Sequence, residues 1–154
     1  MTDLRMTAHF DVPIEKVFEL AKDYKRYPEW NVSYSEVDQV TGPTDMVGTK
    51  FHATMKLLGR PIEGWAEVAE VETPRLIKLI GTAKDGGKLT VIDRFTPVGI
   101  AGTDVEMQVA YELPAGMLGK VADKLFVEKS IERNLRHSLE NFKALVEVKE
   151  PVLV

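Results

Sequence analysis

Between residues 49 and 113 the chain alternates between apolar and polar residues, the pattern of half-buried β-strands. In the clearest segment, every second residue from Val105 to Leu113 is apolar. Turn-forming sequences separate the segments, and the strongest is the hairpin signal Asp85-Gly86-Gly87. The segments are residues 49–58, 62–73, 75–83, 89–96 and 104–113. Together with a short strand at 37–40, they predict an antiparallel meander of about six strands, with one wet and one apolar face.

The N-terminal part combines a weakly alternating strand at residues 2–10 with helical spacing. Asp11 is a plausible N-cap and Pro13 fits the first helical turn, where a missing N–H costs nothing. The helix breaks near Asp23, and a second turn follows at residues 24–30. This turn contains Tyr24, Tyr27, Pro28 and Trp30, which is more aromatic surface than an exposed connector needs. We therefore predict that it forms a wall or lid over an apolar space.

A long C-terminal helix is predicted within residues 114–148 and covers the apolar face of the sheet. Its inward stripe repeats every three or four residues: Val127, Ile131, Leu135, Ser138, Phe142 and Leu145. Apolar residues before position 125 lie on a rotated face, which predicts a kink or a separate short helix around residues 125–129. The last residues, 148–154, are predicted to be a loosely ordered tail.

Length and composition fit one domain spanning residues 1–154 of an ordinary globular protein. The net charge is −4 and no basic stripe is visible, which argues against nucleic acid as a partner. The chain lacks cysteine, an apolar signal core and any stretch approaching the roughly 18 apolar residues of a membrane span. These features predict a cytoplasmic protein, and we expect a monomer or a homodimer.

The order of strand, two short helices, antiparallel meander and long C-terminal helix resembles the helix-grip fold. This α+β fold belongs to the START-like, or polyketide cyclase/dehydrase-like, superfamily that includes Bet v 1-type proteins. Local sequences agree with it, among them PIEKVFEL followed by YPEWN, TPRLIKL, GTDV and ERNLRHSLENFKALVE. The resemblance covers nearly the whole chain and is more specific for fold than for function. It implies a deep apolar cavity between sheet and long helix, entered near the aromatic turn.

The predicted lining of this cavity comes from the inward face of the sheet and from the helices. Small residues at Ala53, Gly64 and Ala66 favour an open space over a filled core. The candidate ligand-binding residues are Phe18, Tyr27, Trp30, Phe51, Met55, Ala66, Leu79, Val91, Met107, Val109, Tyr111, Ile131, Asn134, Leu135 and Ser138. The alternative interpretation is that these residues simply fill the core, as in any sheet protein.

Four polar residues on or near the inward face are candidates for contact with a ligand. Asp93 is in phase with its apolar neighbours, so strict alternation turns it inward as a ligand anchor or acid/base group. A one-residue bulge or a strand-end twist instead places it outside and turns Arg94 inward, or Asp93 pairs with Arg94 at the surface. Asn134 and Ser138 are placed to hydrogen-bond a ligand. Ser138 has the alternative of a hydrogen bond to the backbone of its own helix, four residues back. The hydroxyl of Tyr111 binds a ligand or a backbone partner.

Catalytic motifs are sparse. The three histidines, His9, His52 and His137, are not spaced with carboxylates as metal ligands, so no bound metal is expected. No P-loop, nucleophile elbow or dinucleotide fingerprint is present, so no cofactor is expected. Family cyclases move protons with a few polar groups in the pocket, and the only such set here is Asp93, Arg94 and Tyr111.

Three functions therefore remain open at the level of the sequence. The leading one is binding of a hydrophobic small molecule, such as a lipid, an isoprenoid or quinone, or a polyketide. The second is a polyketide cyclase or dehydratase that works without a metal. The third is a protein-interaction module like the helix-grip co-chaperones, which needs a filled core and an exposed apolar patch.

Overall fold

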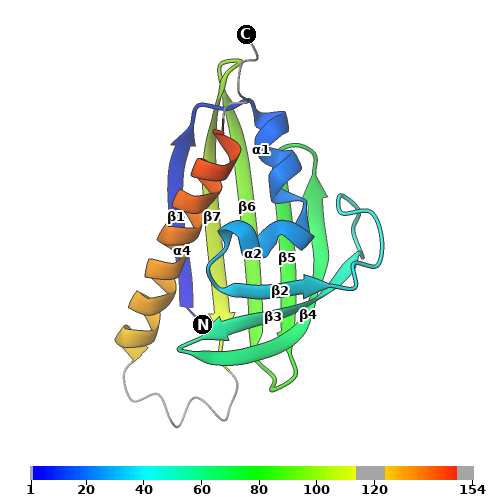
Figure 1. Ribbon diagram of the computed structural model, residues 1–154, viewed down its shortest axis with the longest axis vertical. Coiled ribbons are helices and arrows are strands. Elements are labelled where there is room, and N and C mark those ends of the chain that lie inside the picture. Colours follow the sequence, from blue (N-terminus) through cyan, green and yellow to red (C-terminus); the bar gives the residue numbers. More distant parts are fainter. Residues whose placement is uncertain (1, 114–123, 149–154) are drawn as a thin grey trace.

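Seven antiparallel strands form one curved sheet in the spatial order β1-β7-β6-β5-β4-β3-β2 (Figure 1). The structure is a computed structural model that describes residues 2–113 and 124–148. The strands are β1 (Thr2–Phe10), β2 (Tyr34–Asp38), β3 (Lys50–Leu57), β4 (Arg60–Glu72), β5 (Leu76–Ala83), β6 (Lys88–Val98) and β7 (Gly102–Glu112). The predicted meander is confirmed, and the N-terminal strand joins it by pairing with β7 from Thr2↔Tyr111 to Phe10↔Thr103.

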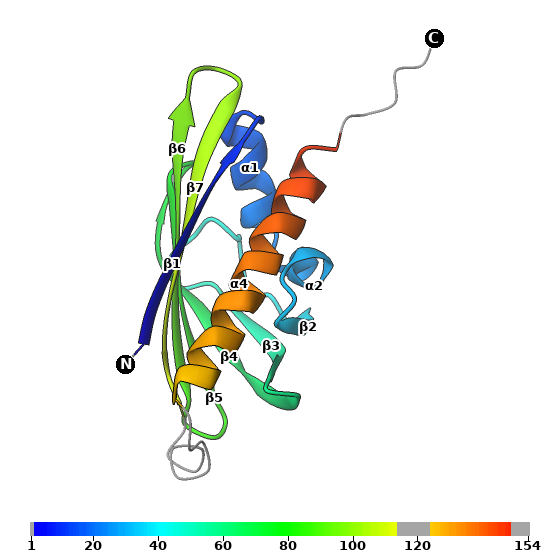
Figure 2. The same ribbon diagram turned by 90° about the vertical axis from the view of Figure 1, so that its left-hand side faces the viewer.

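The helices all lie on the concave side of this sheet (Figure 2). They are α1 (Ile14–Ala21), the 3₁₀ turn η1 (Tyr24–Arg26), α2 (Tyr27–Trp30) and α4 (Lys124–Val146). The fold is therefore the helix-grip α+β arrangement expected from the sequence. Helix α4 is unbroken from Lys124 to Val146, so residues 125–129 belong to one continuous helix. Other sequence-based predictions lie outside the described residues: the part of the C-terminal helix before 124 and most of the 148–154 tail.

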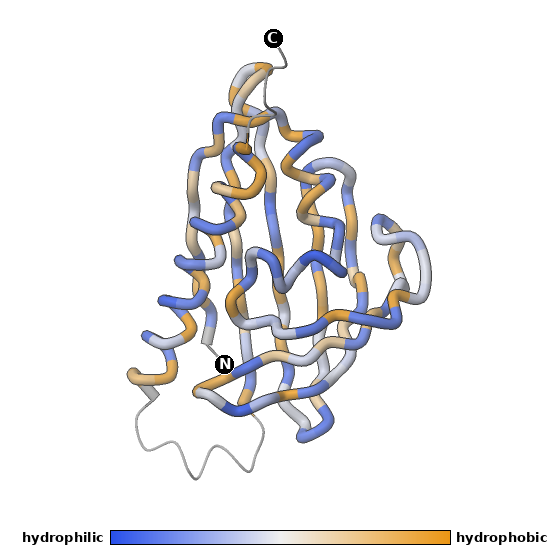
Figure 3. Tube along the Cα trace, in the orientation of Figure 1, coloured by the Kyte–Doolittle hydropathy of each residue, from blue (hydrophilic) through white to orange (hydrophobic). Residues whose placement is uncertain are grey.

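Side-chain alternation gives the sheet one buried and one solvated face, visible as alternating hydropathy along the strands (Figure 3). On β6, for example, Asp93 and Phe95 are buried, whereas Arg94 joins Glu106 of β7 in an ion pair on the opposite face. The buried stripe of α4 covers the inner face: Val127, Leu135, Ser138 and Phe142 are buried, and Ile131 and Leu145 are half-buried. The predicted stripe is confirmed.

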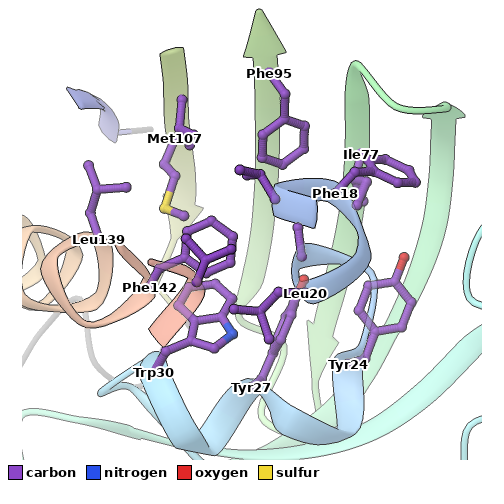
Figure 4. Close-up of a cluster of buried hydrophobic side chains, with 14 of the residues drawn as sticks. Phe18, Leu20, Tyr24, Tyr27, Trp30, Ile77, Phe95, Met107, Leu139 and Phe142 are labelled. Atoms are coloured by element: carbon purple, nitrogen blue, oxygen red, sulfur yellow. The ribbon is translucent and has the colours of Figure 1, made fainter. Parts of the chain in front are cut away.

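The aromatic turn is part of the core. Tyr24, Tyr27 and Trp30 are 0%, 3% and 2% exposed, and they belong to the same buried cluster as Phe142 (Figure 4). Tyr24 stacks on Phe51 with ring centroids 4.8 Å apart, and Trp30 meets Phe142 at 4.7 Å. The Tyr24 hydroxyl also donates a 2.7 Å hydrogen bond to the carbonyl oxygen of Thr44. The segment is therefore a buried wall, the first of the two roles predicted for it, and Tyr27 and Trp30 line the apolar space behind it.

Candidate functional site

A cavity of about 190 Å³ lies between the inner face of the sheet and helix α4. Its wall contains residues from strands β2 to β7, from α2 and its following turn, and from α4. Its exposed lining residues include Lys56, Asp85, Lys88 and Glu112. These four lie at the ends of β3 and β7 and at the β5–β6 hairpin, which share one end of the sheet. The cavity therefore opens at this end, not at the buried aromatic turn.

Small residues keep this space open. Ala53, Gly64, Ala66 and Gly81 occupy adjacent positions on β3, β4 and β5 and all line the cavity. A side chain at Gly64 is sterically blocked, because a Cβ there collides with the backbone oxygen of Thr82 and comes within 2.9 Å of the Ala83 Cα. The region is lined by backbone and methyl groups where a filled core needs larger side chains.

Most of the residues predicted to bind a ligand meet at this cavity. Twelve line it: Tyr27, Trp30, Met55, Ala66, Val91, Met107, Val109, Tyr111, Ile131, Asn134, Leu135 and Ser138. Phe18, Phe51 and Leu79 do not, because they are buried in the packed core. Phe18, for instance, meets Phe95 edge-on at 6.0 Å. Alternation alone cannot separate cavity from core, since both need apolar side chains on one face.

Asp93 faces inward and lines the closed end of the cavity. It is 3% exposed, and its Oδ1 has no hydrogen-bond partner among the residues that the structure describes. Burial disfavours the charged carboxylate and raises the pKa of Asp93 from 3.8 to about 7. A carboxyl group with this pKa changes its charge close to neutral pH.

The charge of Asp93 acts on three tyrosines, which come from η1, α2 and β2. Burial raises the pKa of Tyr24, Tyr27 and Tyr34, and the negative charge of Asp93 raises each pKa further. Tyr27 packs edge-on against Tyr34 at 5.2 Å and against Trp30 at 5.1 Å. The closed end of the cavity is thus an aromatic pocket with one acidic group.

The proposed set of Asp93, Arg94 and Tyr111 does not converge. Arg94 points to the outer face, where its Nη1 donates 2.8 Å hydrogen bonds to Glu106 and Gln108. Tyr111 lines the cavity but pairs with Leu89. Leu89 is four residues from Asp93 along β6, or about 13 Å at the rise of an extended strand. Only Asp93 and Tyr111 face the cavity, and they lie towards opposite ends.

Ser138 has a role that the sequence did not predict. Its Oγ accepts a 3.0 Å hydrogen bond from the Val32 N–H and lies 3.4 Å from the Asn31 Oδ1. The hydroxyl is therefore engaged with the connection after α2, 106 residues away in the chain, and not with its own helix. Asn134, one turn earlier on α4, also lines the cavity.

His52 lies between two carboxylates on the outer face of the sheet. Its Nδ1 is 2.7 Å from Asp38 Oδ1 on β2, and its Nε2 is 2.6 Å from Glu63 Oε1 on β4. These hydrogen bonds raise the pKa of His52 above 6.5. The cluster escaped the sequence analysis because strand register, not spacing along the chain, brings the three residues together. With both ring nitrogens engaged, His52 has no lone pair free for a metal.

Metal and membrane features are absent from the described part of the chain. Within it, no cluster of three or more histidine, aspartate or glutamate side chains is arranged to hold a metal ion. No helix in residues 2–113 and 124–148 is long and apolar enough to span a membrane.

Comparison with known families agrees with this architecture. Residues 1–147 match the family described as polyketide cyclase / dehydrase and lipid transport. The chain belongs to this family. A search of curated proteins finds no match.

Solved structures share the fold at low sequence identity. The ZhuI aromatase/cyclase from Streptomyces sp. R1128 superposes with a TM-score of 0.77 at 18% identity, covering 95% of this chain and 93% of that one. The protein TTHA0849 from Thermus thermophilus gives 0.73 at 21% identity, covering 94% and 97%. A START superfamily protein from Mycobacterium smegmatis gives 0.71 at 14%, covering 94% and 97%. At these identities the likeness concerns the fold alone.

Proposed function

We propose that this protein binds a hydrophobic small molecule, of the lipid, isoprenoid, quinone or polyketide type, in the cavity between the sheet and α4. The observation that carries the proposal is a largely apolar cavity lined by four small residues, Ala53, Gly64, Ala66 and Gly81. Membership of a family described by both cyclase and lipid transport activity supports the same class of ligand.

The driving force is removal of apolar ligand surface from water. At about 25 cal/mol per Å², burying roughly 300 Å² of ligand surface contributes about 7 kcal/mol before the entropic cost of association. Ile131 and Leu135 of α4 face Val91 and Val109 of the sheet across the cavity. Such walls select for shape, and the few polar groups set the orientation of the ligand.

The proposal is tested by filling the cavity from one side of a single strand. Val91 on β6 lines the cavity, whereas its neighbour Ile92 faces the opposite side of the sheet. We expect Val91→Trp to weaken binding of an uncharged naphthalene dye at least tenfold. Ile92→Trp, which adds the same bulk outside, leaves the affinity within twofold. Equal affinities for the two variants would place the dye elsewhere and remove the proposal.

A second function, proton-transfer catalysis on a polyketide-like substrate, is favoured by Asp93. With a pKa of about 7 this buried carboxyl group accepts and returns a proton at neutral pH. Enolisation of a 1,3-dicarbonyl compound needs such a base beside an apolar binding site. The hypothesis predicts that the protein accelerates exchange of the α-hydrogen of an aromatic 1,3-diketone in D₂O, followed by NMR. Equal rates for the wild type and Asp93→Asn would exclude this role for Asp93.

An interaction module receives no comparable support. That function requires a filled core, whereas this fold keeps an internal space beside Ala53, Gly64 and Ala66.

A further inference from the structure

Two buried polar atoms in the residues that line the cavity lack hydrogen-bond partners. They are the indole Nε1 of Trp30 and the Oδ1 of Asp93, and no other buried side-chain nitrogen or oxygen in the described residues is left unpaired. Both residues line the cavity, and both are at least 97% buried. Folded proteins leave few buried polar groups unpaired, because each one loses its bonds to water without replacement. Their occurrence together at one cavity calls for a common explanation.

The two orphaned atoms are chemically complementary. An indole N–H only donates a hydrogen bond, and a carboxyl Oδ1 accepts one. Trp30 and Asp93 come from α2 and β6, and each is linked to Tyr27: the rings of Trp30 and Tyr27 are 5.1 Å apart, and the charge of Asp93 raises the pKa of Tyr27. A hydroxyl group accepts one hydrogen bond while donating another, so it matches both atoms at once.

We propose that the closed end of the cavity binds an uncharged hydroxyl group, an alcohol or a phenol, of an otherwise apolar ligand. The Trp30 N–H donates to the hydroxyl oxygen, and the hydroxyl donates its hydrogen to the carboxyl oxygen of Asp93. Rotation of the carboxyl group about χ2 is soft and exchanges its two oxygens, so either one serves as acceptor. This inference rests on the proposed function and specifies the chemistry of its ligand.

Charge at this end of the cavity excludes an anionic head group. The raised pKa of Asp93 has burial as its cause, and no basic side chain in the described part of the chain offsets it. The charge of Asp93 acts in turn on Tyr24 of η1, Tyr27 of α2 and Tyr34 of β2, and raises the pKa of each. A carboxylate ligand would place a second negative charge in an acidic, low-dielectric pocket, which is unfavourable. A free fatty acid entering head first is therefore a poor ligand, whereas its alcohol is suitable.

Four naphthalene compounds of similar size separate the effects of apolar contact, hydrogen-bond acceptance, hydrogen-bond donation and charge on the affinity. Naphthalene has no polar group, 2-methoxynaphthalene only accepts, 2-naphthol accepts and donates, and 2-naphthoate carries a charge. By calorimetry at pH 7, we expect wild-type protein to bind 2-naphthol about tenfold tighter than 2-methoxynaphthalene or naphthalene. The naphthoate is expected to bind weakest. This series requires no variant, so it remains decisive even if a substitution prevents folding.

Variants then test whether the preference for 2-naphthol depends on the Trp30 Nε1 and on the Asp93 carboxyl group. Trp30→Phe keeps an aromatic ring but removes the N–H, and Asp93→Leu keeps the bulk but removes the acceptor. Each is expected to reduce the preference for 2-naphthol over naphthalene to less than threefold, whereas Asp104→Asn, an exposed aspartate on β7, retains it. Binding of naphthalene reports that the cavity persists in each variant.

The outcomes are distinguishable from failure of the proposed function. If wild-type protein binds naphthalene and 2-naphthol equally, the hydroxyl subsite is overturned while the apolar cavity stands. If both variants keep the wild-type preference, the two atoms are not the anchors. If none of the four compounds binds, the proposed function fails, and the subsite fails with it.

Discussion

Replacing Asp93 by asparagine tests the electrostatic account of the cavity most sensitively. The buried carboxyl group costs much more free energy when it is charged than when it is neutral, because burial removes the charged form from water. Asparagine has nearly the same shape but does not titrate. The variant therefore removes the pH-dependent part of the cost and leaves a constant difference from its own buried amide.

The sign and size of the effect follow from the pKa of Asp93. Burial raises this pKa from 3.8 to about 7, so the folded protein holds a proton between these values that the unfolded chain releases. The contribution of Asp93 to the free energy of unfolding is therefore fully present below about pH 4 and is lost as the pH rises through 7. Three pH units at about 1.4 kcal/mol each give a loss of roughly 4 kcal/mol. Tyr24, Tyr27 and Tyr34 do not contribute, because their pKa values lie above 10.0.

The assay is urea unfolding followed by tryptophan fluorescence at pH 4.5, 6 and 8. The free energy of unfolding of Asp93→Asn minus that of the wild type is expected to increase by about 3 kcal/mol between pH 4.5 and 8. Ile92→Val, which changes the opposite face of β6 and removes no titratable group, should give a difference that is flat with pH. A flat or decreasing difference for Asp93→Asn would refute the claim that burial raises the pKa of this group.

Two further predictions concern the aromatic wall and the outer face. Trp30→Ala should lower the free energy of unfolding, measured with urea, by about 3–5 kcal/mol, because Trp30 packs against Tyr27 and Phe142. A loss below about 1 kcal/mol would mean that the Trp30 ring is not part of the core. The pKa of His52 should exceed 6.5 by NMR titration and fall in Asp38→Asn. The hydrogen bonds of His52 should therefore stabilise β2–β3 pairing below pH 6.5, a contribution lost as the pH rises through the raised pKa. An unchanged His52 pKa in that variant would contradict this pairing.

The fold was predictable from the sequence because local pattern and tertiary structure agree. Alternation from Val105 to Leu113 fixed the face of β7, and the three-four spacing of Val127, Leu135 and Phe142 fixed the buried stripe of α4. These signals depend only on residues close together in the chain, so they do not require knowledge of the tertiary contacts.

The candidate site was predictable only in part, because it depends on contacts between distant segments. The partner of the Trp30 ring is Phe142, and that of the Val32 N–H is Ser138, more than 100 residues away. Burial of the aromatic turn could not be deduced from residues 24–30 alone. The inward orientation of Asp93 depended on whether β6 contains a bulge, and its pairing with β5 and β7 is regular.

The most direct test of the central claim is native mass spectrometry of the protein purified from its own host, followed by solvent extraction. The account predicts a discrete mass above that of the chain, released as an apolar molecule that carries a hydroxyl group. A protein that is free of ligand, and that binds neither naphthalene nor 2-naphthol, would contradict the claim that this cavity is a ligand site.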